Sequence, residues 1–287
     1  MNVVGGLVRA ARPRQWVKNV LVAAAPLAAG TAVRDLDGIL VAFVTFCLMS
    51  SAVYLLNDVL DRDRDRAHPV KRLRPVASGL VPVAVASVTS LVLASAALLL
   101  ARWFAAPALL VVLVLYAAVQ VAYCLWLKHV AVLDLAVVSA GFVLRAVAGG
   151  AAAAVVISPW FLLVAGFASL FVAAGKRYSE VRLVGDGAAT TRSTLGVYSG
   201  SYLRFVWGVA CSATVVFYSL WAFGLERLHP LLAQLSVVPF LLAVLRYAVD
   251  VDRGDAGEPE TIVLRDRTLQ VLGVAWLAMV TVSAVQG

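Results

Sequence analysis

Nine stretches of mostly apolar residues divide this chain, and each is about as long as a helix that crosses a lipid bilayer. A helix needs about 20 apolar residues to cross a hydrocarbon core of about 30 Å. Over the whole chain 62% of the residues are hydrophobic, which is above the roughly half found in soluble domains. The sequence therefore predicts an all-α integral membrane protein with nine transmembrane helices. The expected spans are residues 17–33, 38–56, 81–101, 107–127, 131–150, 155–174, 203–223, 229–248 and 269–286.

The basic residues predict how these spans are oriented. Nine crossings leave little chain for a soluble domain, so we interpret residues 1–287 as one membrane domain. With nine crossings, 20 of the 24 Lys and Arg residues fall on one side, and the positive-inside rule assigns that side to the cytoplasm. We therefore expect a multi-pass protein of the plasma (inner) membrane with a cytoplasmic N-terminus. The long charged loops 57–80, 175–202 and 249–268 would then be cytoplasmic. A nucleic-acid partner is not expected, because the net charge of +8 is explained by topology and by phosphate binding.

A row of acidic residues follows the second predicted span. No Gly or Pro occurs between positions 57 and 67, so the helix is expected to continue to Ala67. At about 100° per residue, four polar side chains fall within an arc of about 100° on this helix. Such a row repels itself unless a cation lies against it, and Mg²⁺ prefers oxygen ligands that it can share with substrate phosphates. We predict a Mg²⁺ site with the three aspartates as catalytic residues; its ligands would be Asn57, Asp58, Asp61 and Asp65.

Basic residues follow the acidic row on a predicted turn. Two prolines end the helix, so Lys71 and Arg74 can fold back toward the acids. This arrangement suits a magnesium pyrophosphate, because the acids would hold the metal and the cations would hold the remaining phosphate oxygens. A simpler interpretation is a solvated helix on which Asp and Arg neutralise each other, and we favour it for Arg62 and Arg66.

The same segment resembles the first signature of the UbiA superfamily of intramembrane transferases. The pattern N-D-x-x-D-x-x-x-D-x-x-H-P-x-K-x-x-R-P runs from Asn57 to Pro75 and matches at nine positions. The resemblance implies an all-helical membrane protein with a central cavity that opens to the cytoplasmic face. It also implies that Mg²⁺ is held on the pyrophosphate of a donor. Most members transfer a prenyl group and carry a second Asp-rich motif after the sixth span.

The second loop departs from that pattern, because its opening segment Gly175–Arg182 has three cations and a single carboxylate. Basic side chains bind phosphate directly, so a donor with a phosphate beyond its pyrophosphate is expected, and phosphoribosyl pyrophosphate is such a donor. The strings K-R-Y-x-E, from Lys176 to Glu180, and R-P-x-Q-W-x-K-N, from Arg12 to Asn19, resemble the branch that acts on decaprenyl phosphate. Candidate donor ligands in this loop are Lys176, Arg177, Tyr178 and Glu180.

That resemblance implies a specific reaction. A 5-phosphoribosyl group would pass from phosphoribosyl pyrophosphate to a polyprenyl (decaprenyl) phosphate, pyrophosphate would be released, and the product would serve cell-wall arabinan synthesis. It also implies a homo-oligomer, such as a trimer.

Further candidate ligands lie at span ends and in the third loop. Lys18 and Lys128 could each bind a lipid phosphate or only extend to the interface, and Asn19 stands beside Lys18 in the resembling string. The third loop could cap the pocket, with Asp250 or Glu258 binding ribose hydroxyls, or it could be a solvated acidic loop. Its candidate residues are Arg246, Tyr247 and Asp250.

Two other functions stay open. One is a prenyltransferase that moves a prenyl group from its pyrophosphate to an aromatic or other small acceptor. The other is a transporter or flippase, which would explain the charges of Asp134 and Arg145 inside the fifth span; a structural pair with another helix explains them equally well. An acidic row at one face does not fit a transporter, whose polar residues lie near the midplane. His68 and His129 are predicted to be structural or interfacial, since an anionic lipid phosphate needs no strong base.

Overall fold

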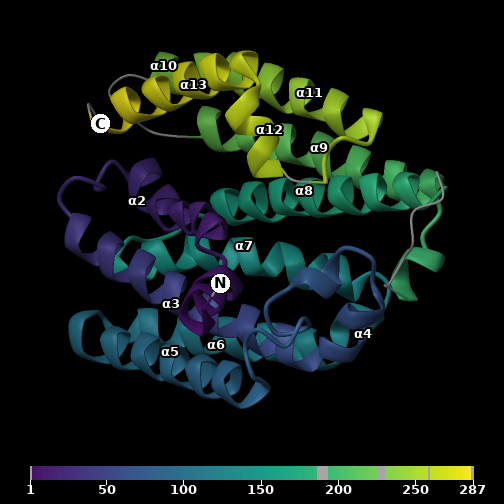
Figure 1. Ribbon diagram of the computed structural model, residues 1–287. Helices are drawn as coiled ribbons and strands as arrows, with labels where there is room; N and C mark the ends of the chain where they lie inside the picture. The colour runs from purple at the N-terminus through teal and green to yellow at the C-terminus, as the bar shows by residue number, and fades with distance from the viewer. Residues whose placement is uncertain (1, 186–192, 225–229, 258, 286–287) are drawn as a thin grey trace.

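The computed structural model describes residues 2–185, 193–224, 230–257 and 259–285. Within these ranges the chain is helical, as predicted, and eight helices are long and apolar enough to cross a membrane (Figure 1). The long helices are α3 (Leu36–Leu60), α5 (Val83–Phe104), α6 (Pro107–Leu125), α7 (Leu133–Ala152), α8 (Pro159–Gly185), α9 (Gly200–Phe223), α10 (Pro230–Leu235) with α11 (Val237–Arg253), and α13 (Arg267–Val285). The short ones are α1 (Val3–Ala11), η1 (Pro13–Ala23), α2 (Ala24–Ala29), α4 (Arg62–Ala67), η2 (Lys71–Leu73), η3 (Leu127–His129), η4 (Ser193–Gly196) and α12 (Pro259–Arg265), where η marks a 3₁₀-helix.

Helix boundaries follow from local sequence. Pro107, Pro159 and Pro230 are the first residues of α6, α8 and α10. Proline has no backbone N–H, and at the first position of a helix this N–H would have no acceptor within the helix, so nothing is lost. Gly254 ends α11 with φ of 88°, a left-handed conformation that costs glycine little. The connections between the long helices therefore begin where the sequence cannot continue a helix.

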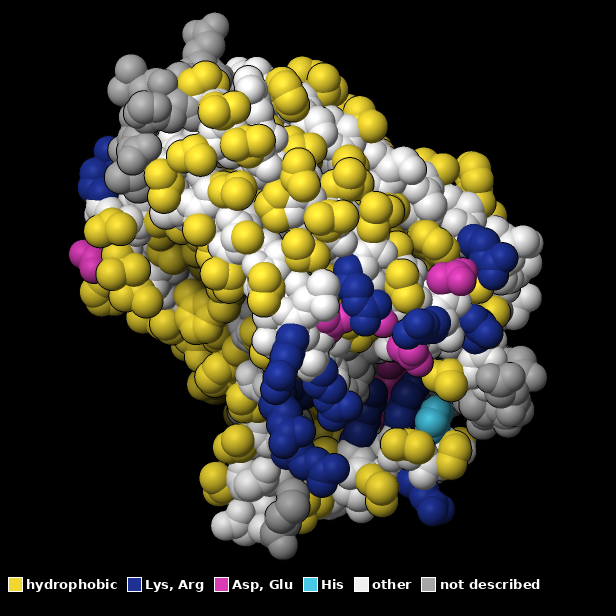
Figure 2. All heavy atoms as spheres, turned by 90° about the horizontal axis from the view of Figure 1, so that it is seen from above, with side chains coloured by type: hydrophobic (Ala, Val, Ile, Leu, Met, Phe, Trp, Pro, Cys, Tyr) yellow, Lys and Arg dark blue, Asp and Glu magenta, His cyan; other side chains and the backbone are white. Residues whose placement is uncertain are grey.

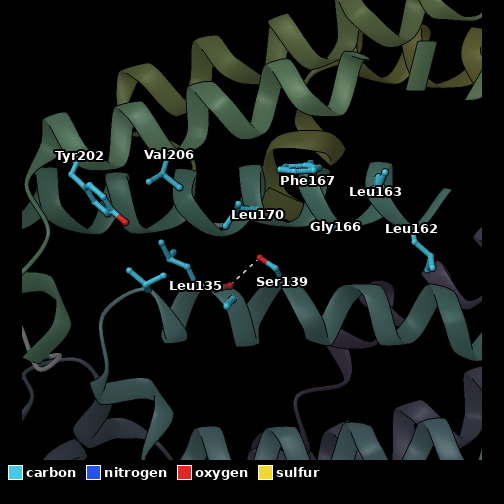
Figure 3. A pocket seen from close by; sticks show the side chains of 11 residues that line it. Leu135, Ser139, Leu162, Leu163, Gly166, Phe167, Leu170, Tyr202 and Val206 are labelled. Atoms are coloured by element: carbon cyan, nitrogen blue, oxygen red, sulfur yellow. Dashed lines mark hydrogen bonds between the residues drawn. The ribbon is translucent and has the colours of Figure 1, made fainter. Parts of the chain in front are cut away.

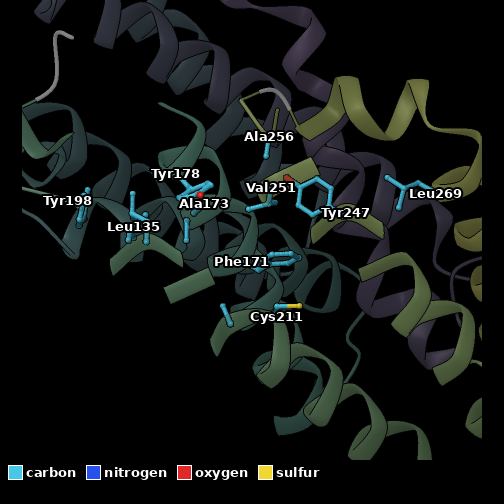
Figure 4. Packing of buried hydrophobic residues seen from close by; sticks show 13 residues of the cluster. Leu135, Phe171, Ala173, Tyr178, Tyr198, Cys211, Tyr247, Val251, Ala256 and Leu269 are labelled. Carbon is cyan, nitrogen blue, oxygen red and sulfur yellow. The ribbon is translucent and has the colours of Figure 1, made fainter. Parts of the chain in front are cut away.

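The helices form a stack in which α3 and α7 are the most buried (Figure 1). α3 packs against α5 and α6, α7 lies between α6 and α8, α8 packs against α9, and α11 against α13. One hydrophobic core joins α3, α5, α6 and α7, and a second joins α7, α8, α9 and α11 (Figure 4). α7 contributes to both cores, so it connects the two sides of the stack.

Much of the outer surface is apolar. Large side chains such as Val88, Leu91 and Val92 of α5 are exposed, as expected of residues that face lipid. In Figure 2, by contrast, Lys, Arg, Asp and Glu side chains gather around a hollow on an otherwise mostly hydrophobic face. The charged chemistry is therefore concentrated at one end of the stack, where α4 lies (Figure 1).

The first predicted span, residues 17–33, is not a continuous α-helix. It consists of η1 and the short helix α2, and Gly30 ends α2 with φ of 75°. Pro13 begins η1, and η1 packs so tightly on α7 that a Cβ on Gly149 would lie 1.5 Å from the Val22 carbonyl oxygen. Eight long helices, and not nine, are therefore present among the described residues.

The predicted helical extension of α3 is interrupted at Asp61. α3 ends at Leu60, Asp61 has φ of −93° and ψ of 4°, and α4 then continues to Ala67. Hydrogen bonds from Asp61 N to Asn57 O and from Asp65 N to Asp61 O bridge the interruption. The acidic row thus stays on nearly helical backbone, and α4 stops before Pro69 as predicted.

Candidate active site

A cavity of about 200 Å³ lies where α3 passes into α4. Its walls come from α3, α4 and the turn after α4, from Arg12 at the start of η1, and from the end of α6 with η3. Six residues predicted as ligands line it together: Asn57, Asp61, Asp65, Lys71, Arg74 and Lys128. The structure therefore brings most of the first-loop prediction into one place.

Each acid of the row is held by a cation. Asp58, which is 2% exposed, lies 2.5 Å from Arg12 Nη2 and 3.3 Å from Arg74 Nη1. Arg74 Nη1 also lies 2.7 Å from an Asp65 oxygen. Lys128 Nζ donates to both oxygens of Asp61, at 2.7 and 2.8 Å. Because the charges compensate each other, the row is stable at the edge of a membrane.

The turn after α4 folds back onto the acids, as the prolines predicted. His68 shapes this turn, since its Nδ1 accepts hydrogen bonds from Val70 N at 3.1 Å and Lys71 N at 3.3 Å. Burial, and then the nearby charge of Lys71, lower the pKa of His68 below its ordinary value, so the ring is neutral at pH 7 and Nδ1 can accept. The turn delivers Arg74 to Asp58 and Asp65.

The simpler interpretation is confirmed for Arg62 and Arg66. Arg62 Nε lies 2.9 Å from an oxygen of Asp63, and Arg66 Nη1 lies 3.8 Å from the same carboxylate. Asp63 is 78% exposed, so these are solvated surface pairs that contribute little to stability.

The candidate ligands of the second loop do not line this cavity. Arg177 is 3% exposed, and its guanidinium binds Asp134 Oδ2 and Glu180 Oε2, each at 2.9 Å. Tyr198 donates a hydrogen bond to Asp134 and accepts one from Val132 N. Asp134 on α7 therefore forms a structural ion pair with Arg177 on α8. A structural pair with another helix was one of the two interpretations of this charge. Arg177 and Glu180 lie within this internal cluster and do not line the described cavity.

The other second-loop candidates also lie off the cavity. Tyr178 is buried in the core between α8 and α9 (Figure 4), where its hydroxyl accepts a hydrogen bond from Arg204 at 2.7 Å. Lys176 is half-buried and is absent from the described cavity lining. Residues 186–192 of this loop lie outside the described residues.

Asn19 lies deep in the stack and not at the cavity. It is fully buried, and its Oδ1 accepts from Arg145 Nε at 2.7 Å, while its Nδ2 contacts Cys47 Sγ and Ser50 Oγ. Arg145 also donates to Gly141 O and to the Tyr116 hydroxyl. The intramembrane arginine therefore ties η1 to α7. Lys18, also on η1, is half-buried and does not line the described cavity.

The third-loop candidates form a separate group. Arg246 lies 2.7 Å from Asp266 and 3.6 Å from Asp250, and Tyr247 packs in the core (Figure 4). None of these residues lines the cavity described above. Glu258 lies outside the described residues.

Several cavity residues were not predicted as ligands. Arg12 was noted only as the first residue of the opening string, His129 only as structural or interfacial, and Arg64 was not among the candidate ligands. Gln120 and Tyr123 line the cavity from α6. Both precede Lys128 by about one to two helical turns. This spacing was the sequence signal that could have predicted their place near Lys128.

A second cavity, of about 340 Å³, lies between α7, α8 and α9 (Figure 3). Phe167, Leu170 and Val206 line it, and the Ser139 hydroxyl is already bonded to Leu135 O at 2.9 Å. This cavity is therefore apolar and offers little that would hold a phosphate.

Residues 19–282 match the model of the UbiA prenyltransferase family. The chain belongs to this family. The resemblance noted between Asn57 and Pro75 is thereby confirmed. This UbiA-family chain is 49% identical to a decaprenyl-phosphate phosphoribosyltransferase of Mycolicibacterium smegmatis, over 97% of this chain and 92% of the relative. It is 50% identical to one of Mycobacterium tuberculosis, over 97% and 94%.

Solved structures confirm the UbiA fold. A UbiA homologue from Archaeoglobus fulgidus bound to DMAPP and Mg²⁺ superposes with a TM-score of 0.75 at 15% identity, over 97% of this chain and 98% of that chain. A digeranylgeranylglyceryl phosphate synthase superposes with a TM-score of 0.69 at 17% identity, over 100% of both chains. With its eight apolar helices, this UbiA-family chain is a multi-pass membrane protein.

The residues fit a metal that is shared with a substrate. Among the described residues no group of three or more His, Cys, Asp or Glu side chains is arranged to hold a metal ion. Mg²⁺, however, is usually bound by one or two protein carboxylates and completes its shell with water and substrate phosphates. Asp61, Asp65 and the Asn57 amide line one cavity, which meets that requirement.

Proposed function

We propose that this chain transfers a 5-phosphoribosyl group from phosphoribosyl pyrophosphate to a polyprenyl (decaprenyl) phosphate, with release of pyrophosphate. The product would be a precursor of cell-wall arabinan. The observation that carries this conclusion is the identity of about half of all residues to decaprenyl-phosphate phosphoribosyltransferases, over nearly the full length of both chains. The charge of the cavity supports it independently.

The cavity is more basic than a metal site alone requires. Among the described residues, five Lys or Arg side chains and two carboxylates line it. A surplus of cations stabilises an anionic ligand in a site that excludes water. Phosphoribosyl pyrophosphate carries a phosphate monoester in addition to its pyrophosphate, so it uses this surplus better than a prenyl pyrophosphate does.

The acids would hold Mg²⁺ against the pyrophosphate. Asn57, Asp61 and Asp65 face the cavity, whereas Asp58 is enclosed by Arg12 and Arg74 and orients those two cations. When bound, Mg²⁺ supplies charge stabilisation for the leaving pyrophosphate. Arg74 and Lys128 add positive charge at the same place, so this electrostatic stabilisation is built into the cavity wall.

The reaction needs no strong general base. A phosphate oxygen of the lipid forms the new bond to the anomeric carbon of ribose, and the bond from that carbon to the pyrophosphate oxygen breaks. The electron pair of the broken bond leaves with pyrophosphate, and the attacking phosphate is already anionic. Positive charge develops on the sugar in the transition state, as in other glycosyl transfers. This explains why His68 can serve in a turn instead.

We further propose nine crossings and a cytoplasmic active site in one domain. At about 2.0 Å per residue for the 3₁₀-helix η1 and about 1.5 Å for α2, the segment Pro13–Ala29 reaches about 31 Å, which matches the hydrocarbon core. Nine crossings, with the basic loops inside, place the N-terminus and the cavity on the cytoplasmic side of the plasma membrane. A homo-oligomer also stays a prediction, which mass measurement of the detergent-solubilised protein would test.

The test is incorporation of labelled ribose phosphate into lipid. The purified protein is incubated with decaprenyl phosphate, Mg²⁺ and phosphoribosyl pyrophosphate labelled in the ribose, and the lipid phase is counted. We expect label in the lipid that depends on both decaprenyl phosphate and the protein. A parallel reaction with a labelled prenyl pyrophosphate and an aromatic acceptor should give no product. Product only in that parallel reaction would refute the proposal in favour of a prenyltransferase.

A further inference from the structure

Arg64 and His129 approach each other at the cavity from two different elements. Arg64 lies on α4 and His129 on η3, and Arg64 Nη1 is 2.9 Å from His129 Nε2. Both residues line the cavity. The Arg64 side chain is 59% exposed, so it can move toward a ligand at little cost. The pair therefore forms a part of the cavity wall beside the acidic row, where Arg64 also lies 3.7 Å from Asp61.

The charge of Arg64 is compensated less directly than that of its neighbours. Arg12, Arg74 and Lys128 each have a carboxylate oxygen within 2.5–2.7 Å. Arg64 Nη1 lies 3.7 Å from Asp61 Oδ1, which is beyond hydrogen-bond distance, and Asp61 is already bonded to Lys128. Arg64 forms its hydrogen bond with the His129 imidazole instead. Arg64 is thus better placed than Arg12, Arg74 or Lys128 to accept a new anionic partner.

The two side chains have the chemistry of a phosphate monoester site. A guanidinium offers N–H groups in a planar fork that matches phosphate oxygens. Nε2 of His129 lies opposite an arginine, which can only donate, so the ring proton belongs on Nδ1. An arriving phosphate can take the Arg64 hydrogen bond, and His129 can donate to the same phosphate from Nε2 in its other neutral tautomer. Both partners of the present bond would then bind the same anion.

In the described part of the second loop, Arg177 does not supply an equivalent site. It was predicted to hold the additional phosphate of the donor through Lys176 and Arg177. Arg177, however, is 3% exposed and binds two carboxylates, so its hydrogen bonds are used inside the protein. A cation for the additional phosphate of the donor is instead available in the cavity wall, where Arg64 lies.

We infer that Arg64 and His129 bind the 5-phosphate of the donor. This rests on the proposed function and assigns a part of its substrate. The lipid acceptor also carries a phosphate monoester, so the chemistry alone fits both. We assign the site to the donor because α4 lies beyond the end of the membrane-spanning helix α3 and Arg64 is largely exposed, away from the region where a lipid chain lies.

The deciding experiment compares two donors that differ only in the 5-phosphate. Transfer to decaprenyl phosphate is measured with phosphoribosyl pyrophosphate and with ribosyl 1-pyrophosphate, for the wild type, Arg64→Gln and His129→Gln. Loss of charge-assisted hydrogen bonds should raise KM for phosphoribosyl pyrophosphate about 10-fold or more in Arg64→Gln. KM for ribosyl 1-pyrophosphate and for decaprenyl phosphate should change less than about twofold. The matched control is Arg62→Gln, which removes the same charge from the same helix but off the cavity and should leave all three KM values unchanged.

A binding measurement makes the test independent of turnover. Calorimetry with ribose 5-phosphate in the absence of Mg²⁺ should show binding to the wild type and to Arg62→Gln, and about 10-fold weaker binding to Arg64→Gln. Three results with Arg64→Gln would each overturn the assignment. They are an equal rise in KM for both donors, unchanged binding of ribose 5-phosphate, and a rise in KM for decaprenyl phosphate alone. A wild type that binds ribose 5-phosphate but transfers no label to lipid would instead refute the proposed function.

Discussion

Replacing Arg177 with alanine should destabilise the protein, and not only weaken donor binding. The guanidinium of Arg177 bonds Asp134 Oδ2 at 2.9 Å, and the side chain of Asp134 is 1% exposed. Without Arg177, Asp134 would keep the Tyr198 hydroxyl as a donor but would lose its neutralising charge. Glu180, the other carboxylate partner of Arg177, is 25% exposed and would be solvated at little cost.

The size of the expected loss in folding stability follows from the burial of Asp134. Removing one partner of a buried ion pair costs about 3–5 kcal/mol, because the remaining charge is left uncompensated. Because Asp134 keeps the hydrogen bond from Tyr198, we expect the free energy of unfolding to fall by an amount at the lower end of this range, about 3 kcal/mol. At about 2–4 °C per kcal/mol for a chain of this size, the melting temperature should fall by about 6–12 °C.

The measurement is thermal unfolding of the purified protein in detergent, followed by tryptophan fluorescence. Arg182→Ala is the control, because Arg182 lies on the same helix and its bond to Asp252 O is exposed; its melting temperature should stay close to that of the wild type. The double variant Asp134→Leu/Arg177→Met should recover most of the loss, because it leaves no buried charge unpaired. Wild-type melting of Arg177→Ala together with a raised KM for the donor would refute this reasoning and make Arg177 a donor ligand.

The other predictions concern the metal site and the packing of the first segment. Asp61→Asn should lower turnover about 100-fold or more even at saturating Mg²⁺, whereas Asp63→Asn, which changes an exposed carboxylate off the cavity, should keep the wild-type rate; equal rates for both would contradict the ligand assignment. Chelation should abolish lipid labelling and added Mg²⁺ should restore it, so labelling that persists under full chelation would rule out the metal. Gly149→Ala should cost about 3 kcal/mol, because its Cβ would lie 1.5 Å from Val22 O. Gly208→Ala, with no neighbour within 4 Å, should be neutral or stabilising by up to about 1 kcal/mol in the same melting assay.

The parts of the site that are close in sequence could be predicted, because a nearly helical backbone determines their relative positions. Asn57, Asp61 and Asp65 share one face for that reason, and the prolines that follow return Arg74 to the acids. Residues joined only by tertiary packing could not be placed. Lys128 reaches Asp61 across 67 positions, and the sequence could not say whether it would meet that acid, a lipid phosphate or water.

The predicted ligands that lie away from the cavity share one physical feature. Arg177 and Asn19 were predicted as ligands from their residue types and from resembling strings, but both face the interior, where Asp134 and Arg145 are their partners. A buried polar residue and a ligand-binding one have the same appearance in a sequence. Similarly, the apolar run of residues 17–33 indicated a span but could not show that its backbone is a 3₁₀-helix followed by a short α-helix.

The bond between Asn19 and Arg145 has a consequence for biogenesis. The two residues are separated by 126 positions, so at about 5–20 residues per second the ribosome needs about 6–25 s to make the partner of Asn19. α3 is made earlier and offers partners to the Asn19 amide nitrogen, but until Arg145 is made the Asn19 Oδ1 acceptor lacks its donor, and an unsatisfied polar group is costly in hydrocarbon. The segment made first would therefore settle into the bilayer late, together with α7, and a pause or truncation before Arg145 should leave it open to membrane quality control.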